Sequence, residues 1–337
     1  MSRQMGSWSL HSLVSIGLAA VTIGCASGGS VKPVPERSEA VNRALKASLE
    51  LPVASANSVA LRLMRQEYDL IESEYRLYFE NYQNDVLAES PLQKGYDLFF
   101  PGNSVVPKYV DAWVETTGSD IAYTARAYYL LSQASSARGG DVISQVPREK
   151  LLEMQRNCDA AAEDFGKAVE NNPGLAPAWV GLLRIAMMAD MPFTVDEVFK
   201  EASRHNQRSF YLRQQYMLAL EPRWGGSYEA MATFARQCAN EVHLNPRFWS
   251  ILGTGYADRA GMFALNGDHK LAIEFYSKAL EYGDKLDWLQ YRSNSLMISG
   301  EYDRAMADAE KILQYSPQHQ KASSLITRIR QLQAQQG

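Results

Sequence analysis

The sequence of 337 residues has little of what most ligand chemistries require. It contains 34 Lys and Arg against 38 Asp and Glu, a formal net charge of −4, so no basic excess favours nucleic acid as a partner. None of the five histidines lies at metal-ligand spacing from another, and we expect no bound metal. The sequence also lacks a Gly-x-Ser-x-Gly elbow, a P-loop and a dinucleotide fingerprint. We therefore predict no catalytic residue and no cofactor.

Cysteine is equally scarce, with Cys25, Cys158 and Cys238 as its three occurrences. Cys158 and Cys238 both fall in helix-like patterns, about two repeat units apart. In a helical repeat protein each unit touches mainly its neighbours, so the two thiols meet only if the superhelix folds back. We expect two buried free thiols, and the alternative is a disulfide, which an exported location permits.

Long apolar runs are missing except for one near the N-terminus. Arg3 precedes an apolar stretch over Leu13–Ile23 that only a few small polar residues interrupt. This run is too short for a permanent membrane-spanning helix and has the layout of a secretory signal. No other run of about 18 apolar residues follows, so a second membrane segment is not expected.

The residues that end this run carry a recognisable pattern. In Val21–Ser30, small or apolar residues precede Gly24 and then Cys25, which resembles the lipobox of bacterial lipoproteins, although Thr22 stands where that family usually has leucine. The resemblance implies removal of residues 1–24 and acylation of Cys25, giving a membrane anchor that does not span the bilayer. Ala26 resembles the sorting pattern for the outer membrane, facing the periplasm. The alternative is an ordinary cleaved signal with an incidental cysteine.

The segment that follows predicts a spacer between lipid and protein. Residues 25–40 contain the cysteine and, over 26–37, Gly, Ser and two prolines, a composition typical of a flexible tether. Its extended reach is on the order of 40 Å at about 3.5 Å per residue. We divide the remainder into an N-terminal helical region, 41–150, and a repeat region, 151–337.

Strand patterns of useful length are absent, and helical periodicity dominates. An apolar stripe with steps of three and four residues runs from Leu61 to Tyr82 and predicts one amphipathic helix. Its tyrosines could form a binding surface, but we favour a core-facing side. Gly139 and Gly140 predict the end of another helix.

The C-terminal half repeats itself. Gly267, Ala272 and Ala279 are followed 33 residues later by Gly300, Ala305 and Ile312. The segments 267–280 and 300–309 resemble the second helix of a tetratricopeptide unit. Upstream, Phe165, Ala168 and Pro173 match the end of such a unit, and Trp179 with Leu182 matches the start of the next. The resemblance implies an all-α, tetratricopeptide-like solenoid.

Several segments also resemble an uncharacterised bacterial family for which no activity is established. They are residues 111–114, 125–129, 137–139 and above all 222–231, which begins Pro-Arg-Trp-Gly-Gly-Ser. The resemblance covers about residues 60–317. It implies that the N-terminal helices and the repeats form one continuous unit.

Four side chains are candidates for binding a partner. Arg223 and Trp224 are of types enriched in binding hot spots, and the two glycines that follow permit an unusual turn. The alternative is an interhelical turn in which Trp224 covers the core and Ser227 caps the next helix. Arg126 and Arg138 could bind anions on the concave face or pair with carboxylates inside the fold, and we favour pairing.

These observations predict a non-catalytic, membrane-anchored scaffold of the bacterial cell envelope. Its partner would be an envelope protein or peptide held in the groove of the solenoid. One alternative is an envelope enzyme, or enzyme subunit, with a pocket formed by Arg126, Arg138 and Arg223. A second is a structural spacer that holds another component at a set distance from the membrane.

Overall fold

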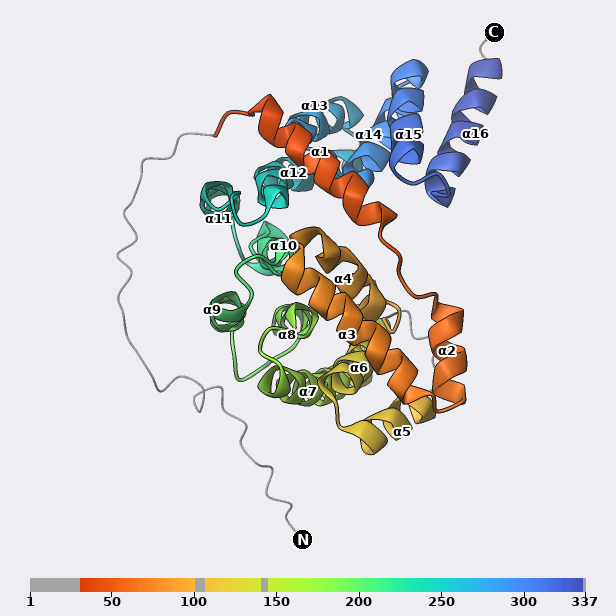
Figure 1. The fold of residues 1–337 in the computed structure, drawn as a ribbon. Helices are drawn as coiled ribbons and strands as arrows, with labels where there is room; N and C mark the ends of the chain where they lie inside the picture. The colour runs from red at the N-terminus through yellow and green to blue at the C-terminus, as the bar shows by residue number, and fades with distance from the viewer. Residues whose placement is uncertain (1–30, 101–106, 141–144, 336–337) are drawn as a thin grey trace.

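The computed structural model describes residues 31–100, 107–140 and 145–335. Within these ranges the chain forms sixteen α-helices and no β-strand, so the all-α prediction is confirmed (Figure 1). No helix in this part of the chain is both long and apolar enough to cross a membrane. The predicted signal peptide and Cys25 lie outside the described residues.

The α-helices are α1 (Pro35–Glu50), α2 (Ala56–Met64), α3 (Tyr68–Asn84), α4 (Glu89–Asp97), α5 (Pro107–Thr117), α6 (Asp120–Arg138), α7 (Arg148–Asn171), α8 (Ala176–Met188), α9 (Val195–His205), α10 (Phe210–Ala219), α11 (Tyr228–Asn240), α12 (Thr254–Leu265), α13 (His269–Leu280), α14 (Leu286–Ile298), α15 (Tyr302–Tyr315) and α16 (Gln320–Ala334).

From α6 onward the helices pack as in a repeat protein. Each helix contacts the next in the chain, and contacts also join α6 to α8, α8 to α10, α12 to α14 and α14 to α16. These even-numbered helices therefore stack on one another, and the 3₁₀ helix η5 (Pro246–Gly253) lies between α10 and α12 in the row. Figure 1 shows this row curving from α7 at the bottom to α16 at the top. Such stacking buries the apolar face that a single helix pair leaves open.

The sequence motifs of the repeats lie where helices approach most closely. Phe165 and Trp179 are both buried, and the Trp179 indole N–H donates to the carbonyl of Pro173 at 2.9 Å. An added Cβ at Gly181 would lie 2.0 Å from the Phe165 ring, so only glycine fits between α7 and α8 at this point.

Successive turns between helix pairs are joined by buried amides. Asn206 donates from Nδ2 to the Pro173 carbonyl at 3.0 Å, one turn back along the row. Asn245 repeats this contact with the Arg208 carbonyl at 2.9 Å. Both side chains are buried. Asn245 supplies the donor for the Arg208 carbonyl, and Asn206 adds a second donor to the Pro173 carbonyl, which also accepts from Trp179.

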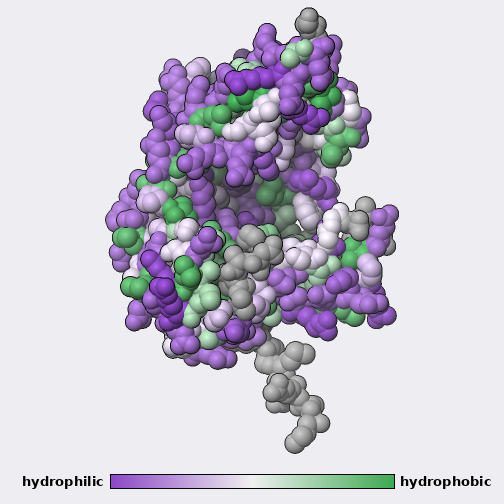
Figure 2. Space-filling view, turned by 90° about the vertical axis from the view of Figure 1, so that its right-hand side faces the viewer, coloured by the Kyte–Doolittle hydropathy of each residue, from purple (hydrophilic) through white to green (hydrophobic). Residues whose placement is uncertain are grey.

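The N-terminal helices lie along this row of turns. From α1, Ser38 Oγ donates to the carbonyl of Glu281 at 2.6 Å, and Asn42 Oδ1 accepts from the backbone N–H of Asp284 at 2.6 Å. Farther down, Glu89 of α4 accepts from Ser209 Oγ and from the backbone N–H of Phe210. The helices α1 and α4 thus pack directly on the repeats. On the face seen in Figure 2 the surface is hollowed between upper and lower parts, at the height of α4 and α10 in Figure 1.

Two local predictions differ from the structure. The single helix expected over 61–82 is instead two helices, because Gln66 has φ 58° and the chain turns between α2 and α3. Leu61 and Met64 are consequently 51% and 55% exposed, whereas the stripe from Tyr68 to Tyr82 is buried as expected.

Part of the segment 25–40, which was predicted as a flexible tether, is ordered in the structure. Helix α1 begins at Pro35, with proline in the first turn, where its missing N–H costs no hydrogen bond. Val31 is held as well, since its carbonyl accepts from the Tyr282 hydroxyl at 2.7 Å.

Candidate functional site

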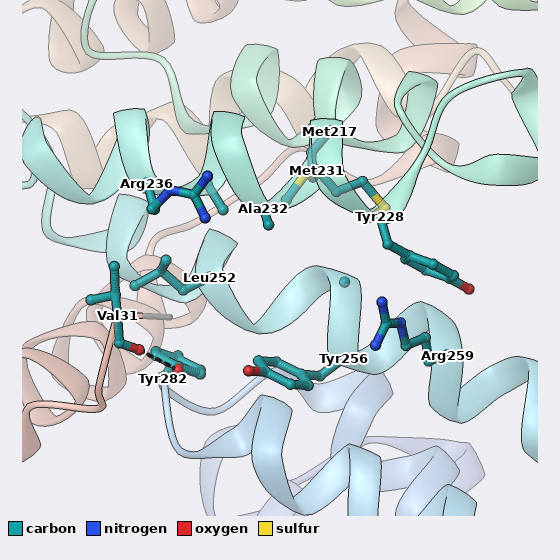
Figure 3. Close-up of a pocket in the computed structure, with 12 residues that line it drawn as sticks. Val31, Met217, Tyr228, Met231, Ala232, Arg236, Leu252, Tyr256, Arg259 and Tyr282 are labelled. Carbon is teal, nitrogen blue, oxygen red and sulfur yellow. Dashed lines mark hydrogen bonds between the residues drawn. The ribbon is translucent and has the colours of Figure 1, made fainter. Parts of the chain in front are cut away.

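A groove lies between α11 and α12 (Figure 3). It has a volume of about 150 Å³. Met231, Ala232 and Arg236 of α11 line one wall, and Tyr256 and Arg259 of α12 face them from the other. The end of the groove is closed by residues from distant parts of the chain, which are Val31, Leu252 of the 3₁₀ helix η5 (Pro246–Gly253) and Tyr282.

Two cationic groups border the groove without an acidic partner. The Arg259 guanidinium lies 4.2 Å from the centre of the Tyr228 ring, and Arg236 donates from Nη2 to Thr233 Oγ1 at 3.0 Å. Neither arginine forms an ion pair with a carboxylate of the described residues. The groove therefore offers positive charge beside an apolar surface.

Two tyrosines of the groove, Tyr228 and Tyr282, are neutral near pH 7. Burial, and then the hydrogen bond from Tyr228 to Asp258 Oδ2 at 2.9 Å, raise the pKa of Tyr228 to about 12. Burial also raises the pKa of Tyr282 to about 12. Tyr256 and Tyr282 stack with ring centres 6.1 Å apart, which gives the closed end an aromatic surface.

The predicted Arg223–Trp224 loop borders this groove. Both residues lie in the 3₁₀ helix η4 (Pro222–Trp224), directly before α11. Arg223 pairs with Glu221 and reaches Asp258 at 3.5 Å, the same carboxylate that accepts from Tyr228. Because Arg223 is paired within the loop, its charge is largely compensated.

The turn after this loop needs its two glycines. Gly225 has φ 88°, and a Cβ at Gly226 would lie 2.1 Å from the Leu220 carbonyl oxygen. Ser227 caps α11 by accepting from the backbone N–H of Ala230 at 3.1 Å, as the turn interpretation predicts. Trp224, however, does not cover the core, since 39% of it is exposed.

The other two predicted arginines lie elsewhere. Arg126 of α6 makes a two-pronged ion pair with buried Asp164, at 2.6 and 2.8 Å, and reaches Asp111 at 3.4 Å. Arg138 ends the same helix and donates to the Gly139 carbonyl at 3.2 Å. Twelve residue steps along the helix separate the two arginines, about 18 Å at 1.5 Å per residue. Neither residue lines the groove, so the structure does not bring the four candidates together.

Sequence reasoning missed Arg236, Arg259 and Tyr256, the residues that give the groove its character. Arg259 follows Tyr256 by three residues, so both lie on one face of α12. That spacing was a detectable signal. Nothing local, however, indicated that α11 would place Arg236 opposite.

The described ranges contain neither a metal-binding cluster nor a reactive thiol. No cluster of three or more His, Cys, Asp or Glu side chains that could hold a metal occurs in the described ranges. Cys158 and Cys238 are buried free thiols, as expected. Burial raises their pKa values to about 11 and about 12, so neither is a reactive thiolate near pH 7.

Comparison with known proteins adds no identity. No model of a known protein family matches the chain, and no curated protein matches its sequence.

Proposed function

We propose that this protein is a membrane-anchored scaffold of the bacterial cell envelope, built from tetratricopeptide-like repeats, that binds a segment of a partner protein between α11 and α12. The observation that carries the proposal is the pair of arginines, Arg236 and Arg259, on opposite walls of a groove lined with Met and Tyr. Neither has a carboxylate partner within the part of the chain that the structure describes. Such a groove suits a segment with an acidic side chain next to an apolar one.

A lipid anchor at Cys25 would be close to the groove along the chain. Val31 lines the closed end, and only six residue steps separate it from Cys25. The chain between them can span at most roughly 21 Å. An acylated Cys25 would therefore hold the groove close to the membrane surface, where a partner anchored in or lying on that membrane would meet it.

The groove favours a binding role over the two alternatives. A spacer has no need of a surface that concentrates tyrosines and unpaired arginines. An enzyme with Arg126, Arg138 and Arg223 in one pocket would need those side chains to converge, whereas two of them are about 18 Å apart on one helix. We accordingly propose no catalytic role.

Site-specific photocrosslinking in intact cells tests the proposal. A photoreactive residue at Ala232, which is exposed and lines the groove, should capture a partner, and the captured peptide should carry Asp or Glu beside an apolar residue. The matched control is Gln237, exposed on the same helix but outside the groove. Equal capture at both positions would contradict a specific groove.

Two substitutions and one control variant test the groove and the anchor independently. Arg259→Glu should reduce capture at Ala232, whereas Arg304→Glu, which changes an exposed arginine paired with Glu301, should not. Cys25→Ser should release the protein from the membrane. If Cys25→Ser remains membrane-bound, the proposed lipid anchor is contradicted, whereas the proposed binding of a partner in the groove is not affected.

A further inference from the structure

A second cationic cluster lies away from the groove, where three turns of the row meet. Arg247 belongs to η5, Lys285 directly precedes α14, and Phe210 begins α10. The Arg247 guanidinium carbon is 3.9 Å from the centre of the Phe210 ring, and Lys285 Nζ is 5.4 Å from the same centre. Lys285 also lies 4.7 Å from the Trp288 ring. Two positive groups are thus gathered around one aromatic ring.

Among the described residues, no side-chain N–H group of Arg247 or Lys285 has a hydrogen-bond acceptor. Arg247 is 7% exposed, and its Nη1 is buried without a hydrogen-bond partner. Lys285 is half-buried and forms neither a hydrogen bond nor an ion pair with the described residues. Buried donors and charges of this kind are costly unless they are paired.

The nearby carboxylates are already engaged. Glu89 accepts from Ser209 and from the Phe210 backbone. Burial raises the pKa of Glu89, and the nearby positive charge of Arg247 opposes this rise. Asp284 accepts from Lys311 at 2.8 Å and from Tyr315 at 2.7 Å.

The balance of charge leaves one cation in excess. Arg213, the third cation of the region, pairs with Glu241 at 2.7 Å. Glu89 offsets Arg247, and Asp287 is exposed and makes no ion pair with Lys285. One positive charge therefore remains, and it matches a monoanion better than a phosphate, which carries about −1.5 to −2 near neutral pH.

We propose that Arg247 and Lys285 bind the carboxylate of a small organic acid beside the Phe210 ring. The unpaired Arg247 N–H groups would donate to the carboxylate, as guanidinium groups do in carboxylate recognition. Lys285 supplies the second positive charge, and the Phe210 and Trp288 rings offer an apolar surface to the carbon end of the acid. The binding of one anion would join the turns before α10, η5 and α14.

Thermal unfolding of the purified full chain tests this site with acetate as the probe. At pH 7 and constant ionic strength, replacing chloride by acetate should raise Tm by about 2–5 °C, in a saturable way. Phosphate should give a smaller rise. No rise with acetate, or a larger one with phosphate, would overturn the assignment.

Two variants locate the effect. Lys285→Met removes the excess charge, so it should unfold at a higher temperature than the native protein in chloride and lose the response to acetate. Lys278→Met is the control, because Lys278 is an exposed lysine paired with Glu274 and should leave the response intact. A full acetate response in Lys285→Met would place the binding elsewhere and refute the proposal.

Discussion

The close approach of α7 and α8 makes Gly181→Ala a strongly disfavoured substitution. The new Cβ would lie 2.0, 2.4 and 2.6 Å from three carbons of the Phe165 ring. The ring has little room to retreat, since it is buried and packs edge-on against Tyr128 with centres 5.4 Å apart. Tyr128 is itself fixed by its hydroxyl, which donates to the Pro177 carbonyl at 2.9 Å.

Two opposing effects set the magnitude. Alanine is favoured over glycine in a helix interior by about 1 kcal/mol. Overpacking of a well-packed core costs typically about 1–3 kcal/mol, and occasionally more. With three contacts far inside van der Waals distance we take the upper part of that range and expect a net loss of about 2 kcal/mol in the free energy of unfolding.

Urea unfolding followed by circular dichroism measures this loss. The control is Gly166→Ala in α7, where an added Cβ meets no atom within 4 Å, and this variant should gain up to about 1 kcal/mol. In a Phe165→Leu background the penalty for Gly181→Ala should shrink, because the ring that clashes is gone. An unchanged or increased stability of Gly181→Ala would refute the packing of α7 on α8.

The remaining predictions concern buried polar groups. Arg126→Ala leaves the buried Asp164 carboxylate without its partner and should cost about 3 kcal/mol in urea unfolding, with part of the loss recovered when Asp164→Ala is added; a neutral Arg126→Ala would contradict the pairing. Asn245→Ala should cost about 2 kcal/mol, because the Arg208 carbonyl loses its donor, and a change below about 0.5 kcal/mol would show that these amides do not join the turns. Burial, and then the charge of Arg247, lower the pKa of Lys285 from 10.5 to about 7, so between these values the unfolded chain binds more protons and stability rises with pH. Between pH 7 and 9 the native protein should gain about 2 kcal/mol relative to Lys285→Met, and parallel stability curves for the two proteins would exclude the shift.

The sequence predicted the fold correctly where the residues of a local motif are also the residues that pack between helices. Phe165, Pro173 and Trp179 stand at repeat spacing, and the structure uses them to bury a helix pair and turn the chain. The stripe from Leu61 to Tyr82 misled because its steps of three and four continue across the break at Gln66. Periodicity reports which residues are apolar and says little about where the backbone turns.

The groove was predictable only in part. The turn over 222–227 stood out in the sequence, and it does border the groove. Arg236 and Arg259 did not stand out, since each lies on an ordinary amphipathic helix and they meet across the groove only through the packing of α11 on α12. The same holds for Val31, which lies far from Tyr282 in the sequence and beside it in the fold.

Charge reversal between the groove and the captured segment is the most direct test of the central claim. A synthetic peptide with the sequence captured at Ala232 should bind the native protein and lose affinity at least about tenfold with Arg259→Glu. Replacing the acidic residue of the peptide by lysine should restore binding to Arg259→Glu and weaken binding to the native protein. Equal binding of both peptides to both proteins would show that the arginines of the groove do not select its partner.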